Sequence, residues 1–322
     1  MANSVLKSEI LFLYETSYNI PNGDPFTGEQ RYDEETKQIL VSDVRIKRFI
    51  RTYFEDIKEI PIYVSEKTGA GKTDAKGVLA WIAENRNDKK KTDIGEILKE
   101  QIDVRLFGGI STLNNDDTKK IKVDGEPCTN GHVQYTGPVQ FALLNPSLNK
   151  VNMRMHQNTT HFTSKEEKTQ GSIGTTTVVP YSLMQVHGWV SSRIAETTGM
   201  TEKDLINMFE ALWYGTSGEG SSHSRSKVGQ DAVLMLNIVY DGENKKIYGA
   251  DRLIKLVPKE GKREEDIRSF DDYALDFTKL HAAVKENKVK EVQYYTELEE
   301  IKNMLEASAD TKKKLVPIVF NL

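Results

Sequence analysis

The chain has 322 residues, of which 38% are hydrophobic and 29% charged, and its formal net charge is −4. This composition indicates a soluble globular protein of one large domain or two small ones, without the ~20 consecutive apolar residues of a membrane span or a signal-peptide pattern at its start. The negative net charge excludes a histone-like protein that binds polyanions through bulk charge, so any nucleic-acid site must be a local patch.

The first predicted element is a strand at residues 10–14, a short apolar run that ends in an aromatic residue. A turn follows, because Pro21 interrupts the run and the pair Asn22-Gly23 tolerates positive φ. The pair Asp24-Pro25 then favours an extended backbone. Taken alone, this segment is as compatible with an ordinary turn as with a loop that contacts a phosphate backbone.

A helix is predicted at residues 43–54, with Ser42 or Asp43 as its N-cap. Apolar and aromatic side chains recur at intervals of three and four residues and form one buried stripe, made of Ile46, Phe49, Ile50 and Tyr53. The rest of the surface carries four cations, which are Arg45, Lys47, Arg48 and Arg51. No acid lies between Asp43 and Glu55 to neutralise them, so this face suits a polyanion. A plain solvated face is the alternative.

Further elements follow at irregular intervals. Strands are predicted at residues 60–64, 139–144, 183–190, 232–240, 289–295 and 315–320. Helices are predicted at residues 74–85, 93–106, 201–214 and 301–308. Because strands and helices do not alternate, a doubly wound sheet is disfavoured. The sequence predicts an α+β fold with a mostly antiparallel sheet and long insertions.

The predicted helix at residues 93–106 has an expected end. Gly108 is a natural C-cap in the left-handed conformation. Arg105 lies in the last turn, where the helix dipole favours a cation. Contact of Arg105 with RNA is an equally good interpretation.

Three segments have the composition of long loops. Residues 65–136 hold charged loops around two helices, and residues 156–180 are rich in Thr, Gly, Ser, Lys and Gln. Such loops are usually functional or become ordered on a partner. Residues 215–229 are rich in Gly and Ser, which let a backbone approach phosphates, and they carry the basic residues His223, Arg225 and Lys227. A mobile surface loop with chance cations is the alternative.

No catalytic set is evident. None of the six histidines shows the spacing of a zinc site, and no nucleophile elbow is present. Asp24 and Asp33 could hold a metal, but no base pairs with them. The single cysteine, Cys128, excludes an internal disulfide and suits a reducing cytoplasm. We expect neither enzymatic activity nor a cofactor.

Five segments together resemble the CRISPR-associated Cas-seven family. They are Asn22-Gly23-Asp24-Pro25, Asp43-Val44-Arg45-Ile46-Lys47-Arg48, Asp103-Val104-Arg105-Leu106-Phe107-Gly108, Gly137-Pro138-Val139-Gln140-Phe141 and Asn158-Thr159-Thr160. The resemblance spans residues 8 to 240. The order and spacing most resemble the type I-B branch, the backbone subunit of that Cascade surveillance complex.

The resemblance implies a single RRM-like (ferredoxin-like) antiparallel palm domain over residues 1–322, with a helical insertion at 65–136 and a protruding thumb at 156–187. It implies that several copies stack head-to-tail along the CRISPR RNA (crRNA) spacer, and that each thumb flips out a base at regular intervals. The other bases stay available for pairing with target DNA in antiviral defence. Implied partners are the crRNA, target DNA through the guide, further copies of the chain and other Cascade subunits, with no membrane.

The resemblance also gives residues their expected roles. Arg45, Lys47, Arg48 and Arg51 would grip phosphates. Asn22, Asp24 and Gln140 would hydrogen-bond ribose or backbone, and Phe162 or Ile173 would wedge between bases. The remaining RNA-binding candidates are Arg105, His156, Asn158, His223, Arg225 and Lys227.

Two other functions stay open. One is a metal-dependent ribonuclease that uses Asp24, since some related CRISPR backbones cut target RNA with a loop aspartate. The other is a generic RRM-like protein that binds cellular RNA as a monomer.

Overall fold

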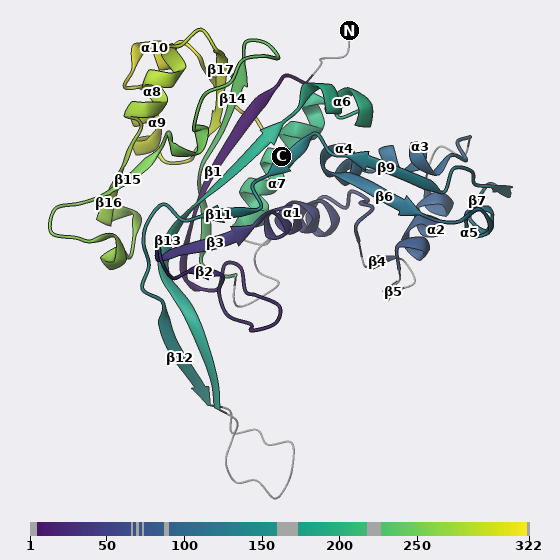
Figure 1. Ribbon diagram of the computed structural model, residues 1–322, viewed down its shortest axis with the longest axis horizontal. Helices are drawn as coiled ribbons and strands as arrows, with labels where there is room; N and C mark the ends of the chain where they lie inside the picture. Colours follow the sequence, from purple (N-terminus) through teal and green to yellow (C-terminus); the bar gives the residue numbers. More distant parts are fainter. Residues whose placement is uncertain are drawn as a thin grey trace, which may run out of the picture.

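A seven-stranded sheet organises this mixed α+β fold (Figure 1). Its strand order is β10-β13-β1-β14-β17-β18, and β12 adds a further pairing to β13. All pairs are antiparallel except β17 with β18, which confirms the predicted mostly antiparallel α+β fold. The strands are β1 (Ser8–Asn19), β10 (Val139–Phe141), β12 (Arg154–Thr159), β13 (Ile173–Val190), β14 (Gln230–Tyr240), β17 (Val289–Tyr295) and β18 (Leu315–Pro317).

This computed structural model describes residues 5–65, 67–68, 71–72, 74–86, 90–159, 173–217 and 227–320. Over these ranges, no helix is long and apolar enough to cross a membrane.

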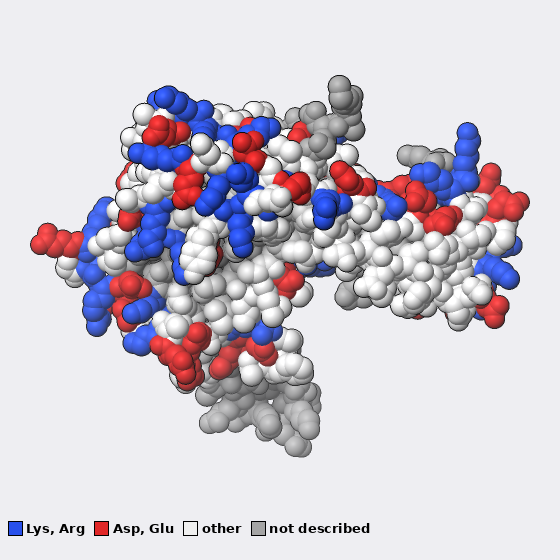
Figure 2. Space-filling model, turned by 45° about the horizontal axis from the view of Figure 1, so that its top comes forward, with Lys and Arg blue, Asp and Glu red and all other residues white. Residues whose placement is uncertain are grey.

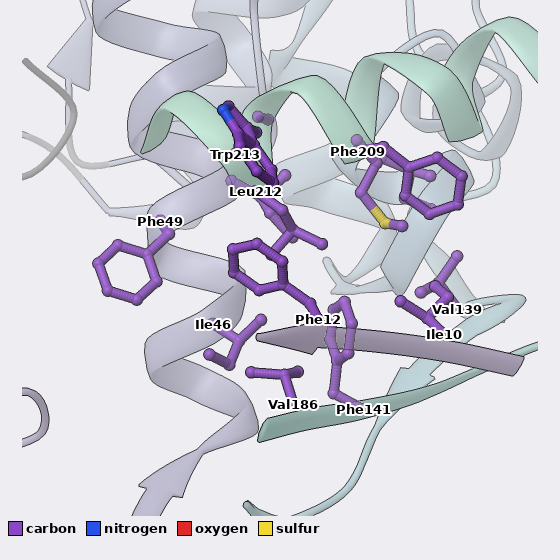
Figure 3. Packing of buried hydrophobic residues seen from close by; sticks show 14 of the residues in the cluster. Ile10, Phe12, Ile46, Phe49, Val139, Phe141, Val186, Phe209, Leu212 and Trp213 are labelled. Carbon is purple, nitrogen blue, oxygen red and sulfur yellow. The ribbon is translucent and has the colours of Figure 1, made fainter. Parts of the chain in front are cut away.

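One face of the sheet packs against helices α1 (Asp43–Thr52) and α7 (Glu202–Thr216). Alternate residues of β1 point to this face, and Ile10 and Phe12 meet Ile46 of α1 and Phe209 of α7 in one cluster (Figure 3). Burying each such side chain contributes roughly 1.5–3 kcal/mol, which fixes both helices on the sheet. After Thr52 the chain continues as a π-helix (Tyr53–Ile57) rather than as the α-helix predicted to residue 54.

The opposite face is covered by the C-terminal part of the chain. Leu11 and Leu13 of β1 pack there in a second cluster with Leu280 and Ile301. The covering elements are β15 (Lys255–Pro258), β16 (Tyr273–Asp276), α8 (Thr278–Lys285), α9 (Glu299–Glu306) and α10 (Ala309–Lys312), with short 3-10 helices at Ala250–Arg252, Glu264–Asp266 and Phe270–Asp272. The central strand is therefore buried on both sides.

The chain that connects α1 to β10 folds into a group of small elements with a separate apolar cluster, at the right in Figure 1. Its core includes Leu79, Ile97 and Val104. The elements are α2 (Ala75–Asn85), α3 (Ile94–Lys99), α4 (Ile102–Phe107), α5 (Asn115–Lys120), and the strand pairs β4 (Lys67–Thr68) with β5 (Gly71–Lys72), β6 (Gly108–Thr112) with β9 (His132–Thr136), and β7 (Lys122–Val123) with β8 (Glu126–Pro127). The helix predicted at residues 93–106 is thus two helices.

A β-hairpin of β12 and the first part of β13 extends away from the sheet (Figure 1). Pairing runs from Arg154 with Val178 to Thr159 with Ile173. From Val179 onward β13 pairs with β1 instead, so the same strand runs from the hairpin into the sheet.

Two strand predictions need correction. Residues 60–64 form no strand, because the backbone N–H groups of Tyr63 and Val64 donate to the buried carboxylate of Asp103 rather than to a neighbouring strand. The strand predicted at 139–144 breaks after Phe141, and β11 (Leu144–Pro146) joins a separate small sheet with β3 (Gln38–Ser42) and β2 (Tyr32–Asp33). A short helix, α6 (Ser192–Thr198), follows β13.

Candidate nucleic-acid interface

The start of α1 is joined directly to the turn after β1. The Ser42 side chain caps the helix by accepting a hydrogen bond from the Arg45 backbone N–H. The Ser42 N–H in turn donates to Asn22 Oδ1, at 2.8 Å. Ile46, Phe49 and Ile50 are buried as predicted, which leaves the cations on the remaining surface of the helix.

Two of the four cations on α1 have acidic partners. Lys47 Nζ lies 3.2 Å from Asp43 Oδ2, one helical turn away. Arg51 Nε lies 3.0 Å from Asp103 Oδ2, and the Asp103 side chain is fully buried. The expectation that no acid neutralises this face is therefore wrong for Lys47 and Arg51. The partner of Lys47 is the helix's own first residue, and the partner of Arg51 comes from α4.

The other two cations, Arg45 and Arg48, form no ion pair within the described ranges. The Arg45 guanidinium lies over the Phe49 ring, 4.0 Å from its centroid. Its Nε is buried without a hydrogen-bond partner among the residues described, and so is the hydroxyl of Tyr14. Burial lowers the pKa of Arg45 to about 10, and repulsion from Arg48 acts in the same direction. Arg48 itself is exposed.

A third cation, Lys227, reaches the same place from the segment before β14. Its Nζ donates to the backbone carbonyl of Ile20, in the turn after β1. Burial, followed by repulsion from Arg45, lowers the pKa of Lys227 to about 7. We call Arg45, Arg48 and Lys227 the cation cluster. Because its members repel one another, an anion bound there would relieve a cost that the free protein carries.

The cluster is held together by the chain segments around it. The Asn19 side-chain amide donates to the carbonyls of Val228 and Gly229, at 3.0 and 3.1 Å. Gly229 has φ +89, and a Cβ there would lie 2.8 Å from the Ser17 carbonyl. The segment that carries Lys227 can therefore approach the end of β1 closely only with glycine at this position.

The polar residues of the turn are engaged within the chain. Asn22 is buried, and Asp24 Oδ1 accepts the Phe26 N–H at 2.9 Å. Asp24 Oδ2 lies 3.0 Å from Arg31 Nη1. These contacts shape the turn, and RNA contacts of Asn22 and Asp24 stay predictions. In the described part of the chain no group of three or more His, Cys, Asp or Glu side chains could hold a metal.

Arg105 is also fixed inside the protein. Its Nε and Nη2 bind the two oxygens of Asp204, at 3.0 and 2.7 Å. Its Nη1 donates to the carbonyls of Lys99 and Glu100. Gly108 does end the helix, but with φ +79 and ψ 177, so its φ is positive while its ψ lies outside the left-handed helical region.

The other predicted residues lie elsewhere. Gln140 is exposed on β10 and donates to the Gly137 carbonyl at 2.9 Å. His156 is exposed on β12. Asn158 and Ile173 take part in the hairpin pairing, where only their backbone is described. Phe162, His223 and Arg225 lie outside the described residues.

Sequence reasoning missed several residues that shape this site. Asp43 could have been identified as the partner of Lys47 from the spacing of four on a helix. Asp103, Tyr14 and the Ile20 carbonyl carried no such signal, because folding alone brings them to α1. On the face shown in Figure 2, acidic and basic side chains are interleaved, so charge on this face is not divided into separate regions.

Comparison with known proteins identifies the family. The family described as CRISPR-associated protein Cas7 matches residues 6–278. The CRISPR-associated protein Cas7 of Haloferax volcanii is 29% identical over 285 residues, which are 85% of this chain and 81% of that protein.

Two solved structures are similar in fold. A chain of a CRISPR RNA-guided surveillance complex has a TM-score of 0.49 at 14% identity, over 91% of this chain and 89% of that one. A chain of such a complex in a pre-nicking state has a TM-score of 0.48 at 14% identity, over 91% and 92%. Since the family match covers most of the chain, this protein belongs to the Cas7 (Cas-seven) family of CRISPR-associated proteins.

Proposed function

We propose that this protein is a non-catalytic, crRNA-binding backbone subunit of a type I-B Cascade surveillance complex. Several copies polymerise along the crRNA spacer and present it for pairing with target DNA. Family membership supports the class of complex. The cation cluster is the observation that carries RNA binding, because it gathers three basic side chains, none with an acidic partner in the described chain. Such a site recognises phosphate and not base sequence.

We also propose that the core is RRM-like. In chain order β1, α1, β10, β13, α7 and β14 follow the βαββαβ pattern of ferredoxin-like domains. Their order in the sheet is β10-β13-β1-β14, and both helices pack on one face. An RRM binds RNA on its open sheet face. Here the C-terminal elements cover much of that face, which supports a guide path along the cation cluster.

The domain plan follows from the same proposal. The chain is one palm, the elements within residues 65–136 are its helical insertion, and residues 156–187 are its thumb. The projecting hairpin supports the thumb assignment. We propose Phe162 or Ile173 as the base wedge, and head-to-tail stacking of copies, a heterologous contact that naturally builds open filaments.

The test is RNA binding by Arg48→Glu, because Arg48 is exposed and its replacement spares the core. The matched control is Arg193→Glu on α6, also an exposed helical arginine without an ion pair in the described chain. Both are co-expressed with a CRISPR array, and bound RNA is quantified and sequenced across a salt series. We expect Arg48→Glu to lose repeat-flanked RNA and the control to keep it. Equal RNA retention in two folded variants would contradict the assignment.

The test also separates the competing functions. Uniform crRNA in an oligomeric particle supports the scaffold. A discrete complex of one protein copy with assorted cellular RNA would instead indicate a generic RNA-binding monomer.

A further inference from the structure

A cavity of about 380 Å³ lies on the sheet face opposite α1, away from the cation cluster. It is bounded by β13, by β11 and its flanking residues, and by the segment that enters β15. Its volume falls in the range of about 300–1,000 Å³ that is usual for small-molecule sites. Polar side chains of β13 line the cavity on the sheet side, and residues of the C-terminal elements line it on the other.

Two side chains of β13 line the cavity with unused acceptors. Gln185 is only 7% exposed; its Nε2 donates to the Asp251 carbonyl, while its Oε1 has no hydrogen-bond partner in the described chain. His187 Nε2 lies 2.8 Å from Oε2 of the buried Glu9, whose Oε1 accepts the Tyr240 hydroxyl. With the proton on Nε2, Nδ1 of His187 is an acceptor. A buried acceptor without a partner is costly, so a ligand that donates hydrogen bonds would be stabilised here.

Three exposed cations line the same cavity: Arg252, Lys255 and Lys279. Neither lysine forms an ion pair within the described ranges. Two acids lie nearby. Asp251 is 3.8 Å from Arg252, and Asp276 lies opposite Lys255 in the backbone pairing of β15 with β16. Positive charge therefore exceeds negative charge at this rim.

An aromatic ring lies next to the cavity rim, in contact with Arg252. Tyr248 is 87% exposed, and the Arg252 guanidinium lies 5.1 Å from its centroid. An exposed aromatic ring among cations is the combination on which nucleic-acid bases stack. The rest of the lining is mixed: Ala142, Leu144, Pro146, Leu148 and Ile254 form an apolar wall, and Gln38, Asn145 and Ser147 add polar groups.

We propose that this cavity binds one nucleotide whose base carries an exocyclic amino group. The base lies against the apolar wall and donates to Gln185 and His187, and the phosphate lies at Arg252, Lys255 and Lys279. The ligand is either a free nucleotide or one nucleotide of a single strand. The inference does not depend on guide binding, because the two sites share no residues.

The experiment is titration calorimetry of the full chain with adenosine 5′-monophosphate (AMP), ribose 5-phosphate and a hexadeoxyadenylate. The variant Lys255→Glu/Lys279→Glu reverses two rim charges. Its control, Lys119→Glu/Lys122→Glu, makes the same change at exposed lysines near and in β7. We expect AMP to bind at least about tenfold more tightly than ribose 5-phosphate, and the rim variant, not the control, to lose about tenfold in affinity.

A second variant, Gln185→Met, removes the buried acceptor at similar volume, together with the donor to the Asp251 carbonyl. It should weaken AMP while leaving ribose 5-phosphate unchanged. The hexanucleotide is measured in the Arg48→Glu background, so that the cation cluster does not contribute. Tighter binding of the hexanucleotide than of AMP identifies a strand as the source, and the reverse identifies a free nucleotide. The proposal is overturned if neither AMP nor the hexanucleotide binds, or if AMP and ribose 5-phosphate bind equally. It is also overturned if an oligoglutamate peptide, titrated in the same way, binds more tightly than AMP.

Discussion

Arg51 Nε lies 3.0 Å from Asp103 Oδ2, and this pair ties the proposed RNA-binding helix α1 to the elements inserted between α1 and β10. Asp103 is fully buried and also accepts the N–H groups of Tyr63 and Val64. One carboxylate therefore satisfies three donors from two segments. Because Arg51 is bound in this contact, we propose that the cation cluster, and not Arg51, binds phosphate.

We expect replacement of Arg105 by Met to destabilise the fold without weakening RNA binding. It would leave the buried Asp204 carboxylate without its bidentate partner, at a cost of roughly 3–5 kcal/mol. Burial raises the pKa of Asp204, but hydrogen bonds from Arg105 lower it, and the pKa lies below its ordinary value. The measurement is urea unfolding. Arg263→Met is the control: Arg263 makes the same bidentate contact with Asp266 on the exposed surface, so its loss should change stability far less. Weaker RNA binding by folded Arg105→Met would instead indicate direct contact with RNA.

RNA affinity should fall as pH rises above 7, through Lys227. Its folded pKa of about 7 lies below the ordinary 10.5, so the unfolded chain binds more protons between these values. Stability of the free protein should therefore rise with pH over that window. A bound phosphate favours the protonated amine, so binding takes up a proton and weakens as pH increases.

The matched variant for this effect is Lys227→Arg, which keeps its charge over the same range. We expect its RNA affinity to vary less between pH 6.5 and 9, at constant ionic strength. Parallel pH profiles for the two proteins would show that the protonation of Lys227 is not coupled to RNA binding.

Gly108→Ala should destabilise the protein by about 2–5 kcal/mol. At φ +79 and ψ 177 only glycine is unstrained, and a Cβ would lie 2.2 Å from the Tyr135 carbonyl oxygen. Gly125→Ala separates strain from collision, because Gly125 has φ +86 but no atom within 4 Å of its added Cβ. It should cost about 1–2 kcal/mol. Equal thermal unfolding of the two variants would rule out the collision as the cause.

Asp24→Ala should leave crRNA assembly intact, and the wild type should not cut target RNA in magnesium. The reason is that Asp24 pairs with Arg31 and orders the turn through the Phe26 N–H. The assay is cleavage of labelled complementary RNA by the purified particle, with Asp33→Ala as a control. Cleavage that is lost only in Asp24→Ala would establish the ribonuclease alternative.

Much of the fold was predictable from side-chain periodicity. The apolar run of β1 and the apolar stripe of α1 are both visible in the sequence; α1 forms near its predicted bounds, whereas β1 extends the predicted residues 10–14 to Ser8–Asn19. The predicted strand at 60–64 failed because its apolar run is short and Asp103 offers its amides a better partner. Local patterns carry no information about an acceptor that folding brings from another element.

The site was predictable in part, for the same reason. The basic face of α1 is visible in the sequence, but the division of its cations is not. Arg51 and Arg48 have the same charge and lie on one helix, yet one is bound to a buried acid and the other is exposed. Only the packing of α4 against α1 separates them.

The continuity of β13 has a mechanical consequence. With a rise of about 3.3 Å per residue, the 18 residues of β13 form one continuous strand from the hairpin into the sheet. Because β13 pairs with β1 from Val179 onward, swinging the hairpin would mean breaking core pairs. In the proposed assembly, each copy would then hold its hairpin at the same angle. Substitutions in the core beneath β13 would alter the spacing between successive contacts on a guide and leave the strength of each contact unchanged.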